Sequence, residues 1–192
     1  MQHYQHLLIL AVVAVAVWCL FIYLWPRLLL SLYKRAILGK GFGEGPIPVN
    51  TLYTQPVKLF AEPLTLQTDS SPVTAGMNHD TLLTVGVLDL SKEPLVLHVP
   101  DMNERYYSVQ FTDPSKNTNF AYVGMRATGT RTGDYLITGP GWKGEAPGGM
   151  PRVSSPNNSV LVIGRVLVES DSDLSTAYDL SKQIKLTPLS AI

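Results

Sequence analysis

Residues 105–112, RYYSVQFT, alternate between two kinds of side chain. On an extended strand the apolar positions fall on one face, and they are Tyr107, Val109 and Phe111. The other face then carries Tyr106, Ser108 and Gln110. A period of two with one apolar face predicts a β-strand that is buried on one side.

Six further apolar runs have a similar length and are bounded by Gly, Pro, Asn or Asp: 63–68, 81–90, 94–100, 120–125, 134–139 and 159–168. Seven short strands separated by turn residues predict a mainly β fold class, an antiparallel sandwich or jelly-roll-like domain. One C-terminal helix is expected after them, because apolar residues recur at spacings of three and four: Leu174, Ala177, Leu180 and Ile184. We expect Ser170, Asp171 or Ser172 to cap it and Pro188 to end it.

The N-terminal region has a different composition. Residues 7–25, LLILAVVAVAVWCLFIYLW, contain no charged residue, Gly or Pro. As a helix they would span roughly 28 Å, close to the hydrocarbon thickness of a bilayer, which predicts a transmembrane helix. Residues 26–40 mix Leu clusters with four basic residues and predict a juxtamembrane amphipathic helix at the lipid headgroups.

A cleaved signal peptide is the alternative for this region. The preceding tail, MQHYQH, has no Lys or Arg, and the apolar run is longer than that of a usual signal peptide. We therefore favour an uncleaved anchor with the lipid bilayer as its partner. The four basic residues follow the span and none precedes it, so the positive-inside rule places the C-terminal body in the cytoplasm.

The sequence thus divides into a tail (1–6), a transmembrane helix (7–25), a juxtamembrane helix (26–40), a linker leading into the body (41–62) and a β domain (63–192). Of the 192 residues, 15 are basic and 15 acidic, and one is Cys. A single Cys excludes a disulfide framework within the chain. From residue 41 onward 11 basic and 15 acidic residues give a net charge of −4 without a basic run, which argues against nucleic acid as a partner.

The densest polar cluster precedes two of the predicted strands. Asn78, His79 and Asp80 come before residue 81, and Asp101, Asn103 and Arg105 come before the strand at 105–112. If the strands are neighbours, these groups could converge, and a His flanked by carboxylates could act as a general base or hold a metal. The alternative is that they are turn formers that bond local backbone, with Arg105 paired to a carboxylate.

Motifs for phosphate binding, zinc hydrolysis and nucleophilic serine chemistry do not occur in the sequence, so we expect no cofactor and no metal. Trp142, in GPGWKGE at 139–145, could offer a stacking surface for a sugar or peptide, or could anchor the tight Gly turns around it. Tyr107 could line a ligand pocket inside the sandwich. His98, in the run at 94–100, is expected to be a half-buried structural residue.

Three phrases together are similar to the family called domain of unknown function 1254. They are MNHDTLLTVGVLDLSKEPLVLHVPDMNERYYSVQFTD (77–113), TGTRTGDYLITGPGWKGE (128–145) and SPNNSVLVIGRVLVES (155–170). The resemblance covers roughly residues 76–189 and implies a jelly-roll-like β domain in a short, membrane-anchored bacterial member. It lends no catalytic residues, because the family has no settled activity.

The resemblance also implies a companion, domain of unknown function 1214, that is fused to the first domain or encoded separately. Because the sequence ends just after the first domain, we expect the companion on another polypeptide. Family members are generally exported, which favours a periplasmic body on a bacterial inner membrane and conflicts with the positive-inside count. The first functional hypothesis is therefore a single-pass membrane protein that binds this partner. The alternative is an envelope-associated hydrolase or small-ligand binder around Asp80 and Asp101.

Overall fold

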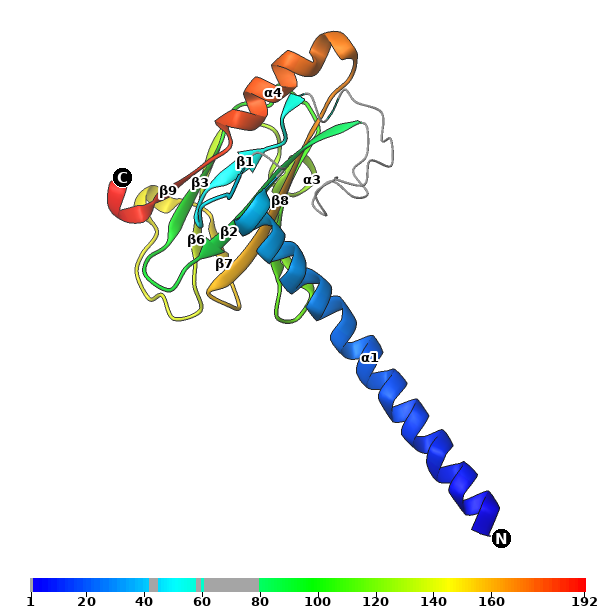
Figure 1. The fold of residues 1–192 in the computed structure, drawn as a ribbon. Helices are drawn as coiled ribbons and strands as arrows, with labels where there is room; N and C mark the ends of the chain where they lie inside the picture. Colours follow the sequence, from blue (N-terminus) through cyan, green and yellow to red (C-terminus); the bar gives the residue numbers. More distant parts are fainter. Residues whose placement is uncertain (1, 42–44, 58–59, 61–79) are drawn as a thin grey trace.

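A computed structural model of the chain describes residues 2–41, 45–57, 60 and 80–192. Figure 1 shows a β body from which one long helix projects as a rod. The helices are α1 (Gln2–Lys40), α3 (Met125–Thr128) and α4 (Leu174–Gln183). The strands are β1 (Leu52–Thr54), β2 (Thr81–Asp89), β3 (Leu95–Val99), β4 (Tyr107–Asp113), β5 (Thr118–Gly124), β6 (Gly133–Thr138), β7 (Arg152–Ser154), β8 (Ser159–Leu167) and β9 (Lys185–Pro188).

Within the described residues, the nine strands form two sheets. The first sheet has the order β1-β2-β8-β4-β5 and the second β7-β6-β3-β9. Every pairing is antiparallel except that of β6 with β7. The predicted fold class, mainly β with two sheets, one C-terminal helix and an N-terminal apolar helix, is confirmed. The run at 63–68 lies outside the described residues.

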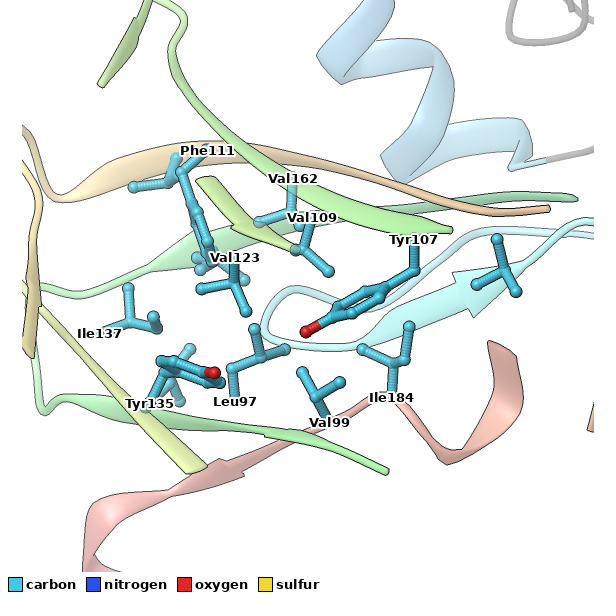
Figure 2. Packing of buried hydrophobic residues seen from close by; sticks show 14 of the residues in the cluster. Leu97, Val99, Tyr107, Val109, Phe111, Val123, Tyr135, Ile137, Val162 and Ile184 are labelled. Atoms are coloured by element: carbon cyan, nitrogen blue, oxygen red, sulfur yellow. The ribbon is translucent and has the colours of Figure 1, made fainter. Parts of the chain in front are cut away.

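The core lies between the two sheets, as Figure 2 shows. Tyr107, Val109 and Phe111 of β4 are at most 1% exposed and point toward Leu97 and Ile137 of the second sheet. Ser108 and Gln110 lie on the opposite face of β4 and are half-buried. The alternation expected for this strand is therefore confirmed, and burial of its apolar face is the main force that joins the sheets.

The helix α1 runs without a break through Pro26. Proline removes one backbone hydrogen bond from a helix. Next to it, Arg27 donates a hydrogen bond from Nη1 to the Tyr23 carbonyl (2.5 Å), and its guanidinium lies 3.7 Å from the centre of the Tyr23 ring. We expected residues 26–40 to form a helix of their own and residues 1–6 a tail, but the described part of both belongs to one helix.

The C-terminal third of α1 packs on the outer face of the first sheet. Ile37 is fully buried and lies in a second apolar cluster with Val85 and Val87 of β2 and Leu161 of β8. Outward-facing side chains of a strand need a cover when they are apolar, and α1 supplies it here. Gly41, with φ of +53°, then ends the helix by donating to the carbonyls of Ala36 and Ile37.

Two basic side chains tie α1 to turns at one end of the sandwich. Arg27 donates from Nε to the Ser115 carbonyl (3.1 Å), and Lys34 donates from Nζ to the Ser159 hydroxyl (2.6 Å). These turns are joined by buried Asp113, which accepts hydrogen bonds from Ser115 and Asn157. Burial raises the pKa of the Asp113 carboxyl, but these hydrogen bonds outweigh it and hold the pKa below its ordinary value. The end of the sandwich nearest the apolar span is therefore rigidly bonded.

Three strands were not predicted, and the C-terminal helix has different ends. The strands β1, β7 and β9 have three or four residues each, too few to show a period. A 3₁₀ turn at Asp171–Asp173 stands where the cap of α4 was expected, and no side chain caps the helix. The helix stops at Gln183, because the chain then pairs with β3, and Pro188 ends a strand at the sheet edge, where a proline is tolerated.

Candidate functional site

The structure describes four of the six residues in the predicted polar cluster, since Asn78 and His79 lie outside the described residues. Asp80 is exposed, and its backbone carbonyl accepts the Val168 N–H. Asp101 is exposed as well, and its carboxylate accepts the backbone N–H of Asn103 at 2.9 Å. Asn103 has a positive φ of 49°. Asp101 and Asn103 thus form a tight turn, as the alternative interpretation of these two residues as turn formers expects.

Arg105 makes the strongest polar contacts of this group. Its Nη2 donates to Oδ1 of Asp173 at 2.6 Å, its Nη1 contacts Oδ2 of the same carboxylate, and Nη1 also donates to the Leu167 carbonyl at 2.8 Å. The side chains of Arg105 and Asp173 are only 11% and 17% exposed. The hydrogen bond from Arg105, together with the Glu169 backbone N–H, holds the pKa of Asp173 below its ordinary value. The pair fastens the connection between β8 and α4 to the start of β4.

Among the described residues, Asp80 and Asp101 share no hydrogen bond, and no group of three His, Cys, Asp or Glu side chains could hold a metal ion. In this cluster, Asp101 and Asn103 therefore form a turn, and Arg105 forms a largely buried ion pair with Asp173. His98 lies elsewhere, on β3, where its Nδ1 is 2.7 Å from Oδ1 of Asp134 on the neighbouring strand β6. Both side chains are about half exposed, so this pair contributes little to stability.

Tyr107 is a core residue. Its side chain is 1% exposed and points between the sheets, with its hydroxyl donating to the Gly129 carbonyl at 3.1 Å. Core neighbours surround the ring, so this side chain supports the packing between the two sheets.

Trp142 borders a surface groove of about 510 Å³. The groove lies between the turn that joins β2 to β3 and the loop after β6, and its lining includes Lys92, Glu93, Pro94, Pro140 and Asn158. The Arg152 guanidinium lies 4.9 Å from the centre of the Trp142 ring and donates to the Trp142 carbonyl. A side chain at Gly144 would come within 2.4 Å of the ring, so glycine is needed there. Trp142 is thus a rigidly held, half-buried aromatic residue beside a groove.

A second hollow, of about 370 Å³, lies on the outer face of the first sheet and was not predicted. It is lined by residues of β4, β5, β8 and α3 and by Tyr106, just before β4; the others include Gln110, Tyr122, Arg126 and Arg165. Arg126 lies 5.6 Å from the centre of the Tyr106 ring. The only sequence signal was the period of two, which puts Ser108 and Gln110 on this face. The two arginines come from segments far apart in the chain.

The fold and its helix define the class of protein. It is a two-sheet β-sandwich carried on a helix that is long and apolar enough to cross a membrane. The most apolar 18 residues of this helix have a mean hydropathy of 3.0, and none of them is buried. A membrane anchor and a signal sequence both fit such a helix near an N-terminus. The family model described as "Protein of unknown function (DUF1254)" matches residues 59–188. The match covers more than half of the chain, which therefore belongs to this family.

Two solved structures are similar to the chain. The VPA0106 protein from Vibrio parahaemolyticus is 25% identical with a TM-score of 0.64, and the match covers 89% of this chain and 37% of that one. An uncharacterised protein from Burkholderia cenocepacia is 11% identical with a TM-score of 0.44, and the match covers 75% of this chain and 36% of that one. No curated protein matches the chain. Because the match covers 37% of the Vibrio protein, the chain spans little more than a third of the length of that protein.

Proposed function

We propose that this chain is a bacterial inner-membrane protein whose β-sandwich is a binding module for a separate protein with the companion domain of unknown function 1214. The observation that carries this proposal is the match to the Vibrio protein, of which only 37% has a counterpart here. In that relative the same fold is one part of a longer chain. This supports a β-sandwich that works together with a further protein part.

The groove beside Trp142 is the surface that best fits a protein partner. Tryptophan, proline and charged residues meet there, and a central tryptophan is the residue type most often found at binding hot spots. Arg152 and Gly144 already fix the ring, so little side-chain freedom would be lost on docking. Among the described residues, no specific contact favours the alternative, a hydrolase or small-ligand binder around Asp80 and Asp101.

We expect Trp142→Ala to weaken partner binding by about 30-fold or more, because removal of a hot-spot residue costs on the order of 2 kcal/mol or more. The full chain would be co-expressed with a companion-domain protein from the same bacterium and purified in a mild detergent. The affinity of the chain for the companion-domain protein would then be measured by surface plasmon resonance. Tyr122→Ala is the matched control, since Tyr122 is an exposed aromatic residue outside the groove. Wild-type chain that recovers no companion protein at low salt contradicts the proposal.

Retention of α1 in the mature protein is part of the proposal. Ile37 and its neighbours on α1 cover apolar side chains of β2 and β8, so loss of the whole helix would expose Val85, Val87 and Leu161 to water. The resemblance to exported relatives favours a periplasmic body, although four basic residues follow the span.

Expression in a Gram-negative host tests both points. We expect the full-length mass in the membrane fraction after an alkaline wash, because the 7–25 segment is long enough to span the bilayer. We also expect external protease to digest the body in spheroplasts. A shortened, soluble product would show that a signal peptide is removed, and a body protected until lysis would place it in the cytoplasm.

A further inference from the structure

Two neighbouring hollows, together called the crevice, lie on the outer face of the first sheet where α1 docks. One part is an apolar hollow of about 470 Å³, lined by Leu29, Leu30, Leu32 and Tyr33 of α1 and by Ile163 of β8. The other part is the hollow that contains Arg126 and Arg165. The two parts adjoin, because Ile163 and Arg165 are successive outward-facing residues of β8 and Arg165 lies within electrostatic reach of the Tyr33 hydroxyl.

The apolar part lies close to the predicted membrane span along α1. Leu29 lies four residues beyond the last residue of the 7–25 segment, about 6 Å farther along the helix. Leu29 and Leu32 remain 46% and 49% exposed although α1 is docked on the sheet. Exposed leucines that continue an apolar span and meet a further apolar wall at Ile163 form a path for a hydrocarbon chain.

The polar part carries positive charge. Arg165 is half-buried, and neither Arg126 nor Arg165 forms a hydrogen bond or ion pair with any residue in the part of the chain that the structure describes. Among the residues that the structure describes, the lining of this hollow contains no carboxylate. Tyr106, Tyr122, Ser108 and Gln110 add neutral hydrogen-bonding groups. Two arginines beside such groups suit a phosphate, which accepts charge-assisted hydrogen bonds from guanidinium.

We propose that the crevice between α1 and the first sheet binds one anionic phospholipid from the adjoining bilayer. Its acyl chain lies against Leu29, Leu32 and Ile163, and its phosphate is held by Arg165 and Arg126. The order of the two parts matches the lipid, since the apolar hollow is nearer the span and the arginines are farther from it. The site shares no residue with the Trp142 groove, so it stands independently of the proposed partner.

Native mass spectrometry of the full chain in detergent tests this site, with phosphatidylglycerol as the probe and phosphatidylcholine as the neutral comparison. We expect one phosphatidylglycerol per chain and weaker binding of phosphatidylcholine. Arg165→Gln should weaken phosphatidylglycerol binding by about tenfold, since a hydrogen bond to a charged group is lost. Arg131→Gln, which removes an exposed arginine outside the crevice, should leave binding unchanged.

The apolar part has its own matched pair of variants. Leu32→Ser should weaken phosphatidylglycerol binding, whereas Leu28→Ser should not, because Leu28 is equally exposed on α1 but does not line the crevice. Equal retention of both lipids, or equal loss in Arg131→Gln and Arg165→Gln, would overturn the proposal. Glycerol phosphate that competes as well as the lipid would show a site for the free anion. A lipid-free pair of chains would show that a second copy fills the crevice.

Discussion

Replacing Arg105 with Ala is expected to lower the free energy of unfolding by about 3 kcal/mol, because it leaves the carboxylate of Asp173 largely buried without its partner. Arg105 contacts both oxygens of Asp173 and the carbonyl of Leu167, so one substitution breaks all three contacts. These contacts join β4 to the segment between β8 and α4. Denaturant unfolding of the full chain in detergent, followed by near-ultraviolet circular dichroism, would measure the loss.

Two further variants separate this ion pair from a general effect of mutation. Arg105→Met combined with Asp173→Leu removes both charges and should cost less than Arg105→Ala alone, because no unpaired charge is left buried. Arg131→Ala, at an exposed position, should change the free energy of unfolding by less than about 0.5 kcal/mol. A double variant that is less stable than Arg105→Ala would show that the pair is not what holds this end of the sandwich.

The same pair predicts a pH dependence. Arg105 holds the folded-state pKa of Asp173 below its ordinary value of 3.8, so the folded state favours the ionised carboxylate. The resulting stabilisation is fully present above that ordinary value and is lost as the pH falls through the lower folded-state pKa. The difference in unfolding free energy between the wild type and Arg105→Ala should therefore narrow below about pH 4. A constant difference from neutral to strongly acidic pH would contradict this explanation.

Replacing Ile37 with Asp is expected to lower the free energy of unfolding by about 3 kcal/mol or more, since it puts a carboxylate where a fully buried side chain meets the sheet. The helix would have to leave the sheet, or the carboxyl group would have to be neutralised. In either case Val85, Val87 and Leu161 lose their cover. Hydrogen exchange should then become faster in β2 and β8, and the unfolding midpoint should fall.

Ser31→Asp is the matched control for Ile37→Asp. It makes the same change in charge on the same helix, but Ser31 is exposed. If the packing of α1 on the sheet is the cause, Ser31→Asp should leave the midpoint and the exchange rates of β2 and β8 nearly unchanged. Equal effects of the two variants would mean that added negative charge, and not the loss of packing, is responsible.

The sequence alone determined the features that depend on local repetition. The apolar segment at 7–25 and the alternation of Tyr107, Val109 and Phe111 are properties of neighbouring residues, and the structure contains both the long apolar helix and the buried strand face. Such patterns are informative because the hydrophobic effect acts on a whole face at once, and a helix and a strand repeat with different periods. The three stretches of sequence that resemble the family indicated the fold class of the body as a whole.

Only the tertiary structure decided which distant residues meet. Asp173 is 68 positions from Arg105, and Arg126 and Arg165 lie on separate elements, so no spacing in the sequence indicates either contact. The packing of Ile37 on β2 and β8 likewise joins residues that are far apart in the sequence. Short strands such as β1 and β9 form because a neighbouring strand has backbone groups available for hydrogen bonds. The position of that neighbouring strand depends on how the rest of the chain has folded.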